Sequence, residues 1–408
     1  MYQLRCIIQN YHWGKKGHDS VVAELKKDED SSFEIKEDEH YAEYWLFFVF
    51  GTHPSGPSEI FAHPETLGKS QGCQSLELPF LSKVLSVETA LSIQAHPDKK
   101  LAEVLHQTKP ALYKDANHKP EMAYALDDFT AMCGFRSAEE IASNLHECIY
   151  LRTLIGETVC SEFEQAVKSN SNVKEALRNV FAAFLEADPS EVVKQVNGMK
   201  EYLATKTEKS FIEEWVAKLI TQYPADSGVF APFLLNLLLL KRGEAIYLGA
   251  DIPHAYLSGN IVETMACSNN VVRAGLTPKA IDKETLIDML TYECGPVRVL
   301  HPISVDDHYA TIQTDAKEFM IEVITLKKGE SYSIPCISIP RILIGYSGCG
   351  KVGDMNVKRG SILFQVADNQ STIVADEDMV VYATHERIYA CMLNKHRTNT
   401  SSIELHQR

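Results

Sequence analysis

The sequence predicts a mainly β protein that carries an inserted helical segment. Residues 1–136 contain short apolar runs between turns rich in glycine and proline, a texture typical of strands. Residues 137–222 contain helix-start signatures instead. Strand-like alternation of apolar and polar residues returns at Gly228 and continues towards the end of the chain. These three textures predict two β regions separated by a block of helices.

Helices are expected at one short segment of the first region and throughout the insert. The short helix spans residues 97–106 and begins at Asp-Lys-Lys-Leu. Within the insert, an Asp-Pro pair at residues 188–189, followed by Glu191, marks a helix start. Other starts are serines followed three residues later by glutamate, the spacing of a capping box. These pairs are Ser137 with Glu140, Ser161 with Glu164, and Ser210 with Glu213.

The last part of the chain reads as an antiparallel β domain. Alternating runs at residues 319–324, 341–344 and 361–364 are separated by turns that contain glycine. We therefore expect a discontinuous first β domain, a helical insert within it and a C-terminal β domain. Their predicted bounds are residues 1–136 with 223–312, residues 137–222, and residues 313–408.

The composition bounds the class of partner. The chain has 408 residues, of which 45% are hydrophobic and 23% charged, as in globular proteins of two or three domains. The formal net charge of −15 argues against nucleic acid, because phosphate backbones select positive surfaces. A small anionic substrate is still compatible with this charge if a few local cations hold it.

The sequence also favours a cytoplasmic location and no membrane partner. The longest apolar runs, residues 44–50 and 230–240, are too short to span a bilayer. Residues 1–14 have no cationic segment that leads into an apolar stretch, so no signal peptide is expected. The ten cysteines occur singly, which suits reduced thiols better than disulfides or a structural zinc site.

A metal site is predicted from three separated segments. In the run Leu-Ser-Ile-Gln-Ala-His-Pro at residues 91–97, strand alternation places Ser92, Gln94 and His96 on one face. An amide oxygen and an imidazole about 7 Å apart along a strand can reach one ion. Glu121, after His-Lys-Pro, and His254, after Ile-Pro, would complete the set. Two imidazoles, a carboxylate and an amide suit zinc, iron or manganese, with room for water or substrate.

Each of these residues also has an ordinary explanation. A single histidine is most often a core or surface residue, and a single glutamate is most often solvated. His63, His106 and His118 are competing ligands that the composition does not dismiss.

Three cations have unusual settings. Arg273 lies between an apolar pair and an Ala-Gly turn, where it could pair with Glu263 or face an anionic substrate. Lys83 is enclosed by apolar residues, and a buried ammonium requires a carboxylate or a bound phosphate as partner. Lys119 would share a strand face with Glu121, which makes it a candidate general base, although a single lysine before a proline is by default solvated.

Long blocks of the discontinuous first β domain match a known family. They are residues 9–14 (Gln-Asn-Tyr-His-Trp-Gly), 51–58, 79–81, 90–106, 113–125, 243–256 and 263–279. In these blocks the chain resembles the type I phosphomannose isomerases (mannose-6-phosphate isomerases). The resemblance implies a cupin-type jelly roll with an inserted helical domain and a C-terminal cupin-like β domain. It also implies interconversion of mannose 6-phosphate and fructose 6-phosphate.

The resemblance further implies the roles of individual site residues. It implies one zinc ion per chain, an active-site arginine and a set of contacts to the substrate phosphate. The implied zinc ligands are Gln94, His96, Glu121 and His254, the arginine is Arg273, and the phosphate contacts are Lys83, Ser92 and Lys279.

The chain departs from the family pattern at one point. The family typically has Ala-Glu-Leu-Trp followed by one methionine before Gly-Thr-His-Pro. Here residues 42–45, Ala-Glu-Tyr-Trp, are followed by Leu-Phe-Phe-Val-Phe at residues 46–50. Four extra residues would displace the following chain by roughly 13 Å if extended, or would expose apolar surface if looped out.

For the reaction we expect a path through a cis-enediol intermediate. We also expect the chain to act as a monomer. Arg273 would stabilise negative charge or guide the substrate. Lys119, His118 and Glu263 are candidates for the general base, and Lys119 ranks first because of its expected strand face. The enzyme would supply mannose 6-phosphate for GDP-mannose synthesis and protein glycosylation.

Two other functions remain open at this point. The first is an iron-dependent cupin dioxygenase with His96, Glu121 and His254 as its ligands. Gln94 disfavours it, because oxygen and substrate both need open positions on the metal. The second is a non-catalytic sugar-phosphate binding protein that has kept the fold.

Overall fold

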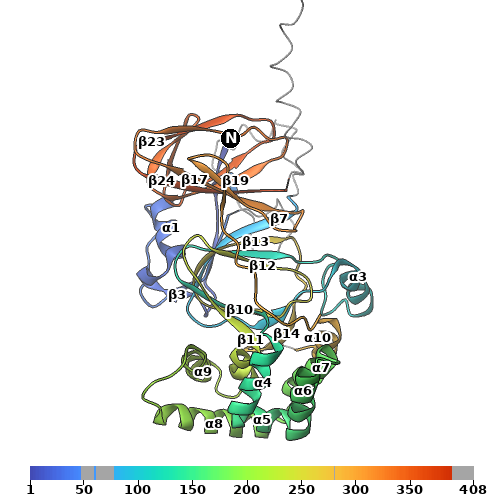
Figure 1. Cartoon of the computed structure of the whole chain (residues 1–408). Helices are drawn as coiled ribbons and strands as arrows, with labels where there is room; N and C mark the ends of the chain where they lie inside the picture. Colours follow the sequence, from blue (N-terminus) through green and yellow to red (C-terminus); the bar gives the residue numbers. More distant parts are fainter. Residues whose placement is uncertain (47–58, 61–77, 280, 388–408) are drawn as a thin grey trace, which may run out of the picture.

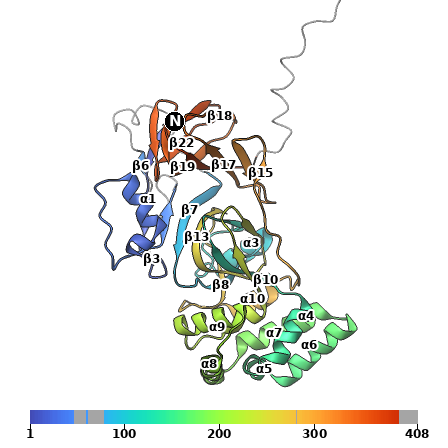
Figure 2. The same cartoon turned by 60° about the vertical axis from the view of Figure 1, so that its left-hand side comes forward.

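The computed structural model describes residues 1–46, 59–60, 78–279 and 281–387. Three parts follow one another along the molecule in Figure 1: strands of the C-terminal region, a central β region, and the helices of residues 138–222. Figure 2 shows the same order from a second direction. Four of the five apolar residues after Trp45, and also His63, lie outside the described residues.

One ten-stranded antiparallel sheet forms the central region. Its strands are β2 (Ile8–Gln9), β5 (Glu43–Trp45), β7 (Phe80–Val87), β8 (Ile93–Ala95), β9 (Glu121–Ala125), β10 (Phe129–Phe135), β11 (Leu235–Leu240), β12 (Ala245–Leu248), β13 (His254–Ala266) and β14 (Val272–Gly275). Six of them follow the order β11-β10-β13-β7-β5-β2, and β8, β9, β12 and β14 pair beside this path. Two further strands, β3 (Lys15–Lys16) and β4 (His40–Tyr41), form a small sheet.

Strand β13 brings the segments of the site together. It pairs with β7 from Gly259 opposite Val87 to Ala266 opposite Phe80, and it also pairs with β8, β9 and β10. At Gly259 the backbone has φ +115°, and a Cβ atom would lie 2.5 Å from the carbonyl oxygen of Asp128. Only glycine fits this close approach, so the path of β13 depends on it.

The C-terminal region consists of two further antiparallel sheets. The larger contains β15 (Ile303–Ser304), β16 (Tyr309–Ile312), β17 (Met320–Leu326), β24 (Met379–His385), β19 (Arg341–Ser347), β22 (Ile362–Gln365), β1 (Tyr2–Arg5) and β6 (Glu59–Ile60), in that order. The smaller contains β18 (Ser331–Ile334), β23 (Ser371–Ala375), β20 (Cys349–Val352) and β21 (Met355–Lys358). The predicted runs at 319–324, 341–344 and 361–364 correspond to β17, β19 and β22. Strand β1 pairs with β22, so the first strand of the chain lies in the C-terminal sheet.

The helices concentrate in the expected segment. Within the described residues they are η1 (Gly17–Asp19), α1 (Val21–Glu29), α3 (Lys99–Thr108), α4 (Ala138–Glu147), α5 (Ile149–Ile155), α6 (Glu157–Ser169), α7 (Val173–Glu186), α8 (Pro189–Thr205), α9 (Phe211–Gln222), η2 (Ser227–Phe233) and α10 (Lys283–Met289). Capping boxes are present at Ser137 and Ser210, and Asp188 caps α8 with proline at its first position. The start predicted at Ser161 is wrong. That residue lies inside α6, which begins after Gly156.

Aromatic contacts and a hydrogen bond between side chains join the three parts. The rings of Tyr124 in the central sheet and Tyr382 in β24 lie 5.2 Å apart, and Ser82 donates a hydrogen bond to Thr384. On the helical side, the ring of Phe135 packs 5.2 Å from that of Phe181. The predicted class, mainly β with inserted helices, is confirmed, and the exact domain bounds stay a prediction.

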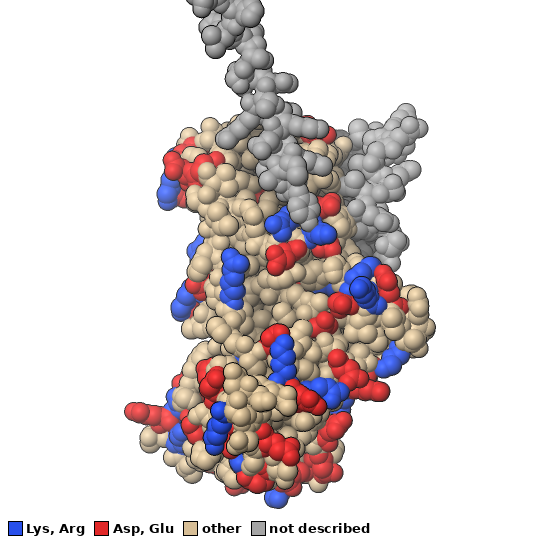
Figure 3. Space-filling model, turned by 45° about the vertical axis from the view of Figure 1, so that its right-hand side comes forward, with Lys and Arg blue, Asp and Glu red and all other residues tan. Residues whose placement is uncertain are grey.

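The surface charges, the cysteines and the lengths of the helices can be compared with the expectations from the sequence. On the face shown in Figure 3, lysines and arginines are scattered among acidic residues. Every cysteine in the described ranges is a free thiol. None of the helices in these ranges combines the length and the apolar character needed to cross a membrane.

Candidate metal centre

Three buried side chains from three strands meet in the central region. His96 follows β8, Glu121 begins β9 and His254 begins β13, and each is at most 1% exposed. His96 Nε2 lies 3.4 Å from Glu121 Oε1, and His254 Nε2 lies 3.5 Å from Glu121 Oε2. Ligand atoms at tetrahedral zinc are separated by roughly 3.4 Å, given bond lengths of about 2.1 Å. The three side chains are therefore spaced as ligands of one cation.

The facing atoms of this cluster lack hydrogen-bond partners among the described residues. This holds for Nε2 of both histidines and for both carboxylate oxygens of Glu121, although Lys119 Nζ forms an ion pair with Oε1 at 2.7 Å. Buried polar atoms without partners are rare and costly. A divalent cation between them would satisfy all of these atoms, so the residues present fit a metal ion.

The protonation states also suit metal binding. Burial lowers the pKa of His96 to about 4, so its ring is neutral near pH 7 and can act as a ligand. Burial alone would raise the pKa of Glu121, but the charge of Lys119 is the largest of the opposing effects, which together hold that pKa well below its ordinary value. The carboxylate is therefore ionised.

Backbone carbonyls orient both imidazoles. His96 Nδ1 lies 2.7 Å from the carbonyl oxygen of Asn270, and His254 Nδ1 lies 2.9 Å from that of Ile252. A carbonyl can only accept, so each Nδ1 carries the proton and each Nε2 presents a lone pair to the cluster. Such a partner on the far side of a metal-binding histidine is the usual arrangement.

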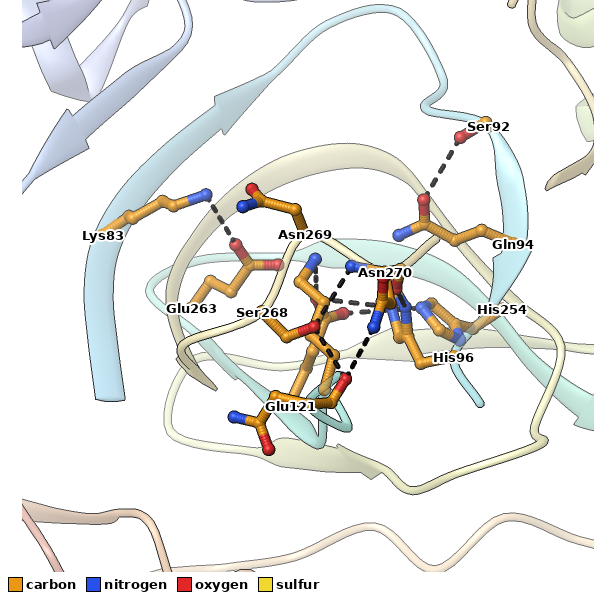
Figure 4. A network of polar contacts seen from close by, with 12 residues as sticks. Lys83, Ser92, Gln94, His96, Glu121, His254, Glu263, Ser268, Asn269 and Asn270 are labelled. Atoms are coloured by element: carbon orange, nitrogen blue, oxygen red, sulfur yellow. Dashed lines mark hydrogen bonds and ion pairs between the residues drawn. The ribbon is translucent and has the colours of Figure 1, made fainter. Parts of the chain in front are cut away.

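Gln94 connects the cluster to Arg273 across neighbouring strands. It lies opposite His254 on β13 and opposite Arg273 on β14. Figure 4 shows Gln94 beside the two histidines, with Ser92 donating a hydrogen bond of 3.3 Å to its Oε1. The predicted amide ligand therefore lies next to the three-residue cluster.

Arg273 is half-buried, and no described residue forms a hydrogen bond or an ion pair with its guanidinium. Burial lowers its pKa, and no described charge counters that effect. The sequence left open a structural pair with Glu263, and the structure shows that Glu263 pairs with Lys83 instead. An enclosed guanidinium without a partner is suited to bind an anion.

Lys83 forms ion pairs with two carboxylates. Its Nζ lies 3.4 Å from Glu43 Oε2 and 3.5 Å from Glu263 Oε2, and it lies over the ring of Trp45 at 5.4 Å. Burial would lower the pKa of Lys83, but Glu43, Glu263 and Glu121 outweigh it and raise the pKa. The ammonium is therefore charged and balanced from within the protein. The ion pair with Glu263 is visible in Figure 4.

Glu263 differs from Glu121 in the direction of its pKa shift. Burial and the nearby charge of Glu121 raise the pKa of Glu263, and Lys83 counteracts them only in part. The buried Tyr256 lies on the same strand, where burial and Glu263 raise the pKa of its hydroxyl well above the ordinary value. The site thus combines an ionised carboxylate at the cluster with a second carboxyl group that holds its proton more readily.

The remaining predicted residues lie in different settings. Lys119 is at the edge of the cluster, with its side chain 11% exposed. His118 turns to the C-terminal region, where its Nε2 lies 2.6 Å from Glu318 Oε1. Lys279 is exposed, and His106 bonds to the carbonyl of Tyr113.

Sequence reasoning missed Glu43, Tyr256, Asp115 and Asn270. The sequence pattern could have identified Tyr256, because this residue lies two positions after His254 and shares its strand face. The pattern could not identify Glu43, because the contact of Glu43 with Lys83 depends on the pairing of β5 with β7.

Comparison with known proteins identifies the family. The description "Phosphomannose isomerase type I, catalytic domain" matches residues 1–138, and the corresponding "helical insertion domain" matches residues 154–235. The mannose-6-phosphate isomerase of Bos taurus is 39% identical, covering 94% of this chain and 97% of its own length. The chain belongs to the type I phosphomannose isomerase family.

Further mannose-6-phosphate isomerases are similar over most or all of their length. Mannose-6-phosphate isomerase 1 of Arabidopsis thaliana is 37% identical, covering 93% of this chain and 92% of its own. A crystal structure of a lysine-to-alanine mutant of the phosphomannose isomerase from Salmonella typhimurium is 28% identical with a TM-score of 0.80. A mannose 6-phosphate isomerase crystallised with zinc and yttrium is 28% identical with a TM-score of 0.79. Each structure matches 95% of this chain and 100% of its own.

These comparisons confirm three predictions from the sequence. The family is the one predicted, the fold is the cupin-type fold of phosphomannose isomerases, and the enzyme class is aldose–ketose isomerase.

Proposed function

We propose that the chain interconverts mannose 6-phosphate and fructose 6-phosphate with one zinc ion held by Gln94, His96, Glu121 and His254. The observation that carries the proposal is the buried His96–Glu121–His254 cluster, whose facing atoms have no hydrogen-bond partners among the described residues. The names of the relatives supply the substrate, and a relative crystallised with zinc supports that metal.

The chemistry moves a proton between C1 and C2 of the sugar through a cis-enediol. When bound at the cluster, zinc would polarise and orient the sugar oxygens. Negative charge that develops on those oxygens would be stabilised by Arg273, whose guanidinium has no described partner to compete for it.

Lys119 remains the first candidate for the general base. It lies at the edge of the cluster and is part-buried, with its Nζ 2.7 Å from Oε1 of the proposed ligand Glu121. Glu263 is suited to supply or hold a proton, because its raised pKa lies closer to neutral pH. His118 ranks last, since Glu318 already engages its ring.

The substrate phosphate would be held by Ser92 and Lys279, with Lys83 as a third group. Ser92 is half-buried beside Gln94, and Lys279 is exposed near the end of β14. The charge of Lys83 is already balanced by Glu43 and Glu263. Lys83 would therefore attract a phosphate most strongly when Glu263 is protonated, a state that its raised pKa favours.

An anaerobic assay with mannose 6-phosphate separates this proposal from its rivals. The isomerase converts the substrate without oxygen, whereas an iron-dependent dioxygenase would require Fe(II) and consume oxygen. A sugar-phosphate binding protein would bind the substrate without turnover. Formation of fructose 6-phosphate by the anaerobic, zinc-loaded protein supports the proposal, and its absence from a folded, zinc-loaded protein refutes it.

The proposed role in the cell follows from this reaction. The chain would act in the cytoplasm as a monomer and supply mannose 6-phosphate for GDP-mannose synthesis and protein glycosylation. The free thiols of all described cysteines agree with a reducing compartment. The catalytic domain would comprise residues 1–136 and 223–312, although β1, β6, β15 and β16 within these bounds pair in the C-terminal sheet. The helical insert and the C-terminal sheets lie on either side of the central β region in Figure 1.

A further inference from the structure

Asp115, a residue with no role in the proposed chemistry, lies at the centre of a network beside the metal cluster. Its Oδ1 accepts hydrogen bonds from the backbone N of Asn117 at 3.0 Å, from Ser268 Oγ at 2.9 Å and from Asn270 Nδ2 at 3.3 Å. Its Oδ2 accepts from the backbone N of Asn269 at 2.7 Å. One carboxylate therefore joins two loops that are far apart in the sequence.

Asn270 transmits this arrangement to a proposed metal ligand. It is fully buried, and its Nδ2 donates to the carbonyls of Asp115 at 2.7 Å and of Asn117 at 2.8 Å. Its own carbonyl oxygen accepts the hydrogen bond from His96 Nδ1 at 2.7 Å. Figure 4 shows Asn270 beside His96. The position of the Asn270 carbonyl, and with it the ring of His96, is thus fixed through Asp115.

Both joined loops lead directly into the site. Residues 115–117 precede Lys119 and Glu121, and residues 267–270 precede Arg273. Two more hydrogen bonds close the junction, from Asn117 Nδ2 to the carbonyl of Cys267 at 3.0 Å and from Ser268 Oγ to the carbonyl of Asn117 at 2.9 Å. A change at Asp115 would therefore disturb the ligand Glu121 and the orientation of His96 together.

We propose that Asp115 and Asn270 are positioning residues that set the metal affinity of the centre by fixing His96 relative to Glu121. The proposal rests on the proposed function, in that it takes His96 and Glu121 as metal ligands. Neither positioning residue forms a hydrogen bond with the facing atoms of the cluster, so both act through the ligands. Partners of this kind typically change metal affinity by about 10- to 100-fold when they are mutated.

The sharpest variant is Asp115→Asn, which keeps the shape of the side chain. It replaces one acceptor oxygen by an NH₂ group, which then faces a donor in the network. Asn270→Ala removes the second positioning residue. Lys114→Ala is the matched control, because Lys114 is exposed on the same loop and belongs to neither the network nor the proposed site.

The test measures zinc affinity by competition with a chromophoric chelator, and the visible absorption of the Co²⁺-substituted proteins. We expect Asp115→Asn and Asn270→Ala to bind zinc about 10- to 100-fold more weakly than the wild-type chain. Their Co²⁺ bands should be shifted, and Lys114→Ala should match the wild-type chain in both measurements. A merely structural role would lower the melting temperature and leave zinc affinity and the Co²⁺ spectrum unchanged, which would overturn the proposal.

A milder variant covers the case in which Asp115→Asn does not fold. Ser268→Ala removes a single hydroxyl from the network and should weaken zinc binding less. Wild-type zinc affinity in Ser268→Ala would also overturn the proposal. The proposed function is judged separately: a wild-type chain that binds zinc but does not isomerise mannose 6-phosphate refutes that function, while the ratio of variant to wild-type zinc affinity still tests the positioning role.

Discussion

Arg273 lies opposite Gln94 on paired strands, and Gln94 lies opposite His254 on the next strand. Adjacent strands are about 4.8 Å apart, so one strand spacing separates Arg273 from Gln94 and about 10 Å of sheet separates it from His254. The guanidinium is half-buried and has no partner among the described residues. This cross-strand line connects the metal cluster to the group best suited to hold an anionic substrate.

Arg273→Ala should lower kcat/KM for mannose 6-phosphate by about 10²- to 10³-fold, the usual cost of losing one group that stabilises developing charge. The melting temperature should stay unchanged, because no described residue depends on the guanidinium. Arg298→Ala is the control, since Arg298 is an exposed arginine outside the site. Wild-type kcat/KM in Arg273→Ala would contradict the assigned role.

Lys83→Met should destabilise the protein by about 3–5 kcal/mol, because it leaves the buried carboxylates of Glu43 and Glu263 without their shared cation. Urea unfolding measures the loss. Adding Glu263→Gln to Lys83→Met should restore part of the stability, since one buried charge is then removed. Equal stability of Lys83→Met and the wild-type chain would show that the ion pairs do not hold these strands together.

Lys119→Ala should slow exchange of the C2 proton of the sugar with solvent by about 10²- to 10⁴-fold, the range for loss of a general base. NMR in D₂O measures this exchange directly. Zinc content must be measured in parallel, because Lys119 also forms an ion pair with Glu121. Wild-type exchange in a zinc-loaded Lys119→Ala protein would transfer the role of base to Glu263 or His118.

The C-terminal region should show acid-sensitive stability that depends on Glu322. Burial would raise the pKa of this carboxyl, but His385 and Arg341 outweigh it and lower the pKa from 4.5 to about 2. A lowered folded pKa means that the stabilisation is present above pH 4.5 and is lost as the pH falls towards 2. The shift corresponds to about 3 kcal/mol.

Unfolding of wild-type and Glu322→Gln proteins at pH 3 to 7 tests this linkage. The variant should be less stable at pH 7, because Arg341 is then buried without its carboxylate. The difference in stability between the two proteins should shrink as the pH falls below 4.5. A constant difference across the whole range would contradict the shifted pKa.

Local pattern predicted the parts of the structure that depend on neighbouring residues. Alternation in residues 91–97 placed Gln94 and His96 on one face, and two of the three proposed capping boxes are present. The helix start at Ser161 failed, because the same spacing also occurs inside a helix. His96, Glu121 and His254 were proposed together because each lies in a distinctive motif.

The features that the sequence did not predict depend on contacts between segments far apart in the chain. Strand β1 lies in the C-terminal sheet, where it pairs with β22 from the far end of the chain. The carboxylate partners of Lys83 come from β5 and β13, which only the sheet register brings together. The contacts of Asp115 with residues 268–270 likewise join two loops with no local signal of their meeting.

A zinc titration of the metal-free protein tests the central claim most directly. After chelation, isomerase activity on mannose 6-phosphate should be absent, and added zinc should restore it with saturation at one ion per chain. Glu121→Gln, which removes a charged ligand from the cluster, should remain inactive at the same zinc concentrations. Full activity in the chelated protein, or in Glu121→Gln without bound zinc, would contradict a zinc-dependent isomerase built on this cluster.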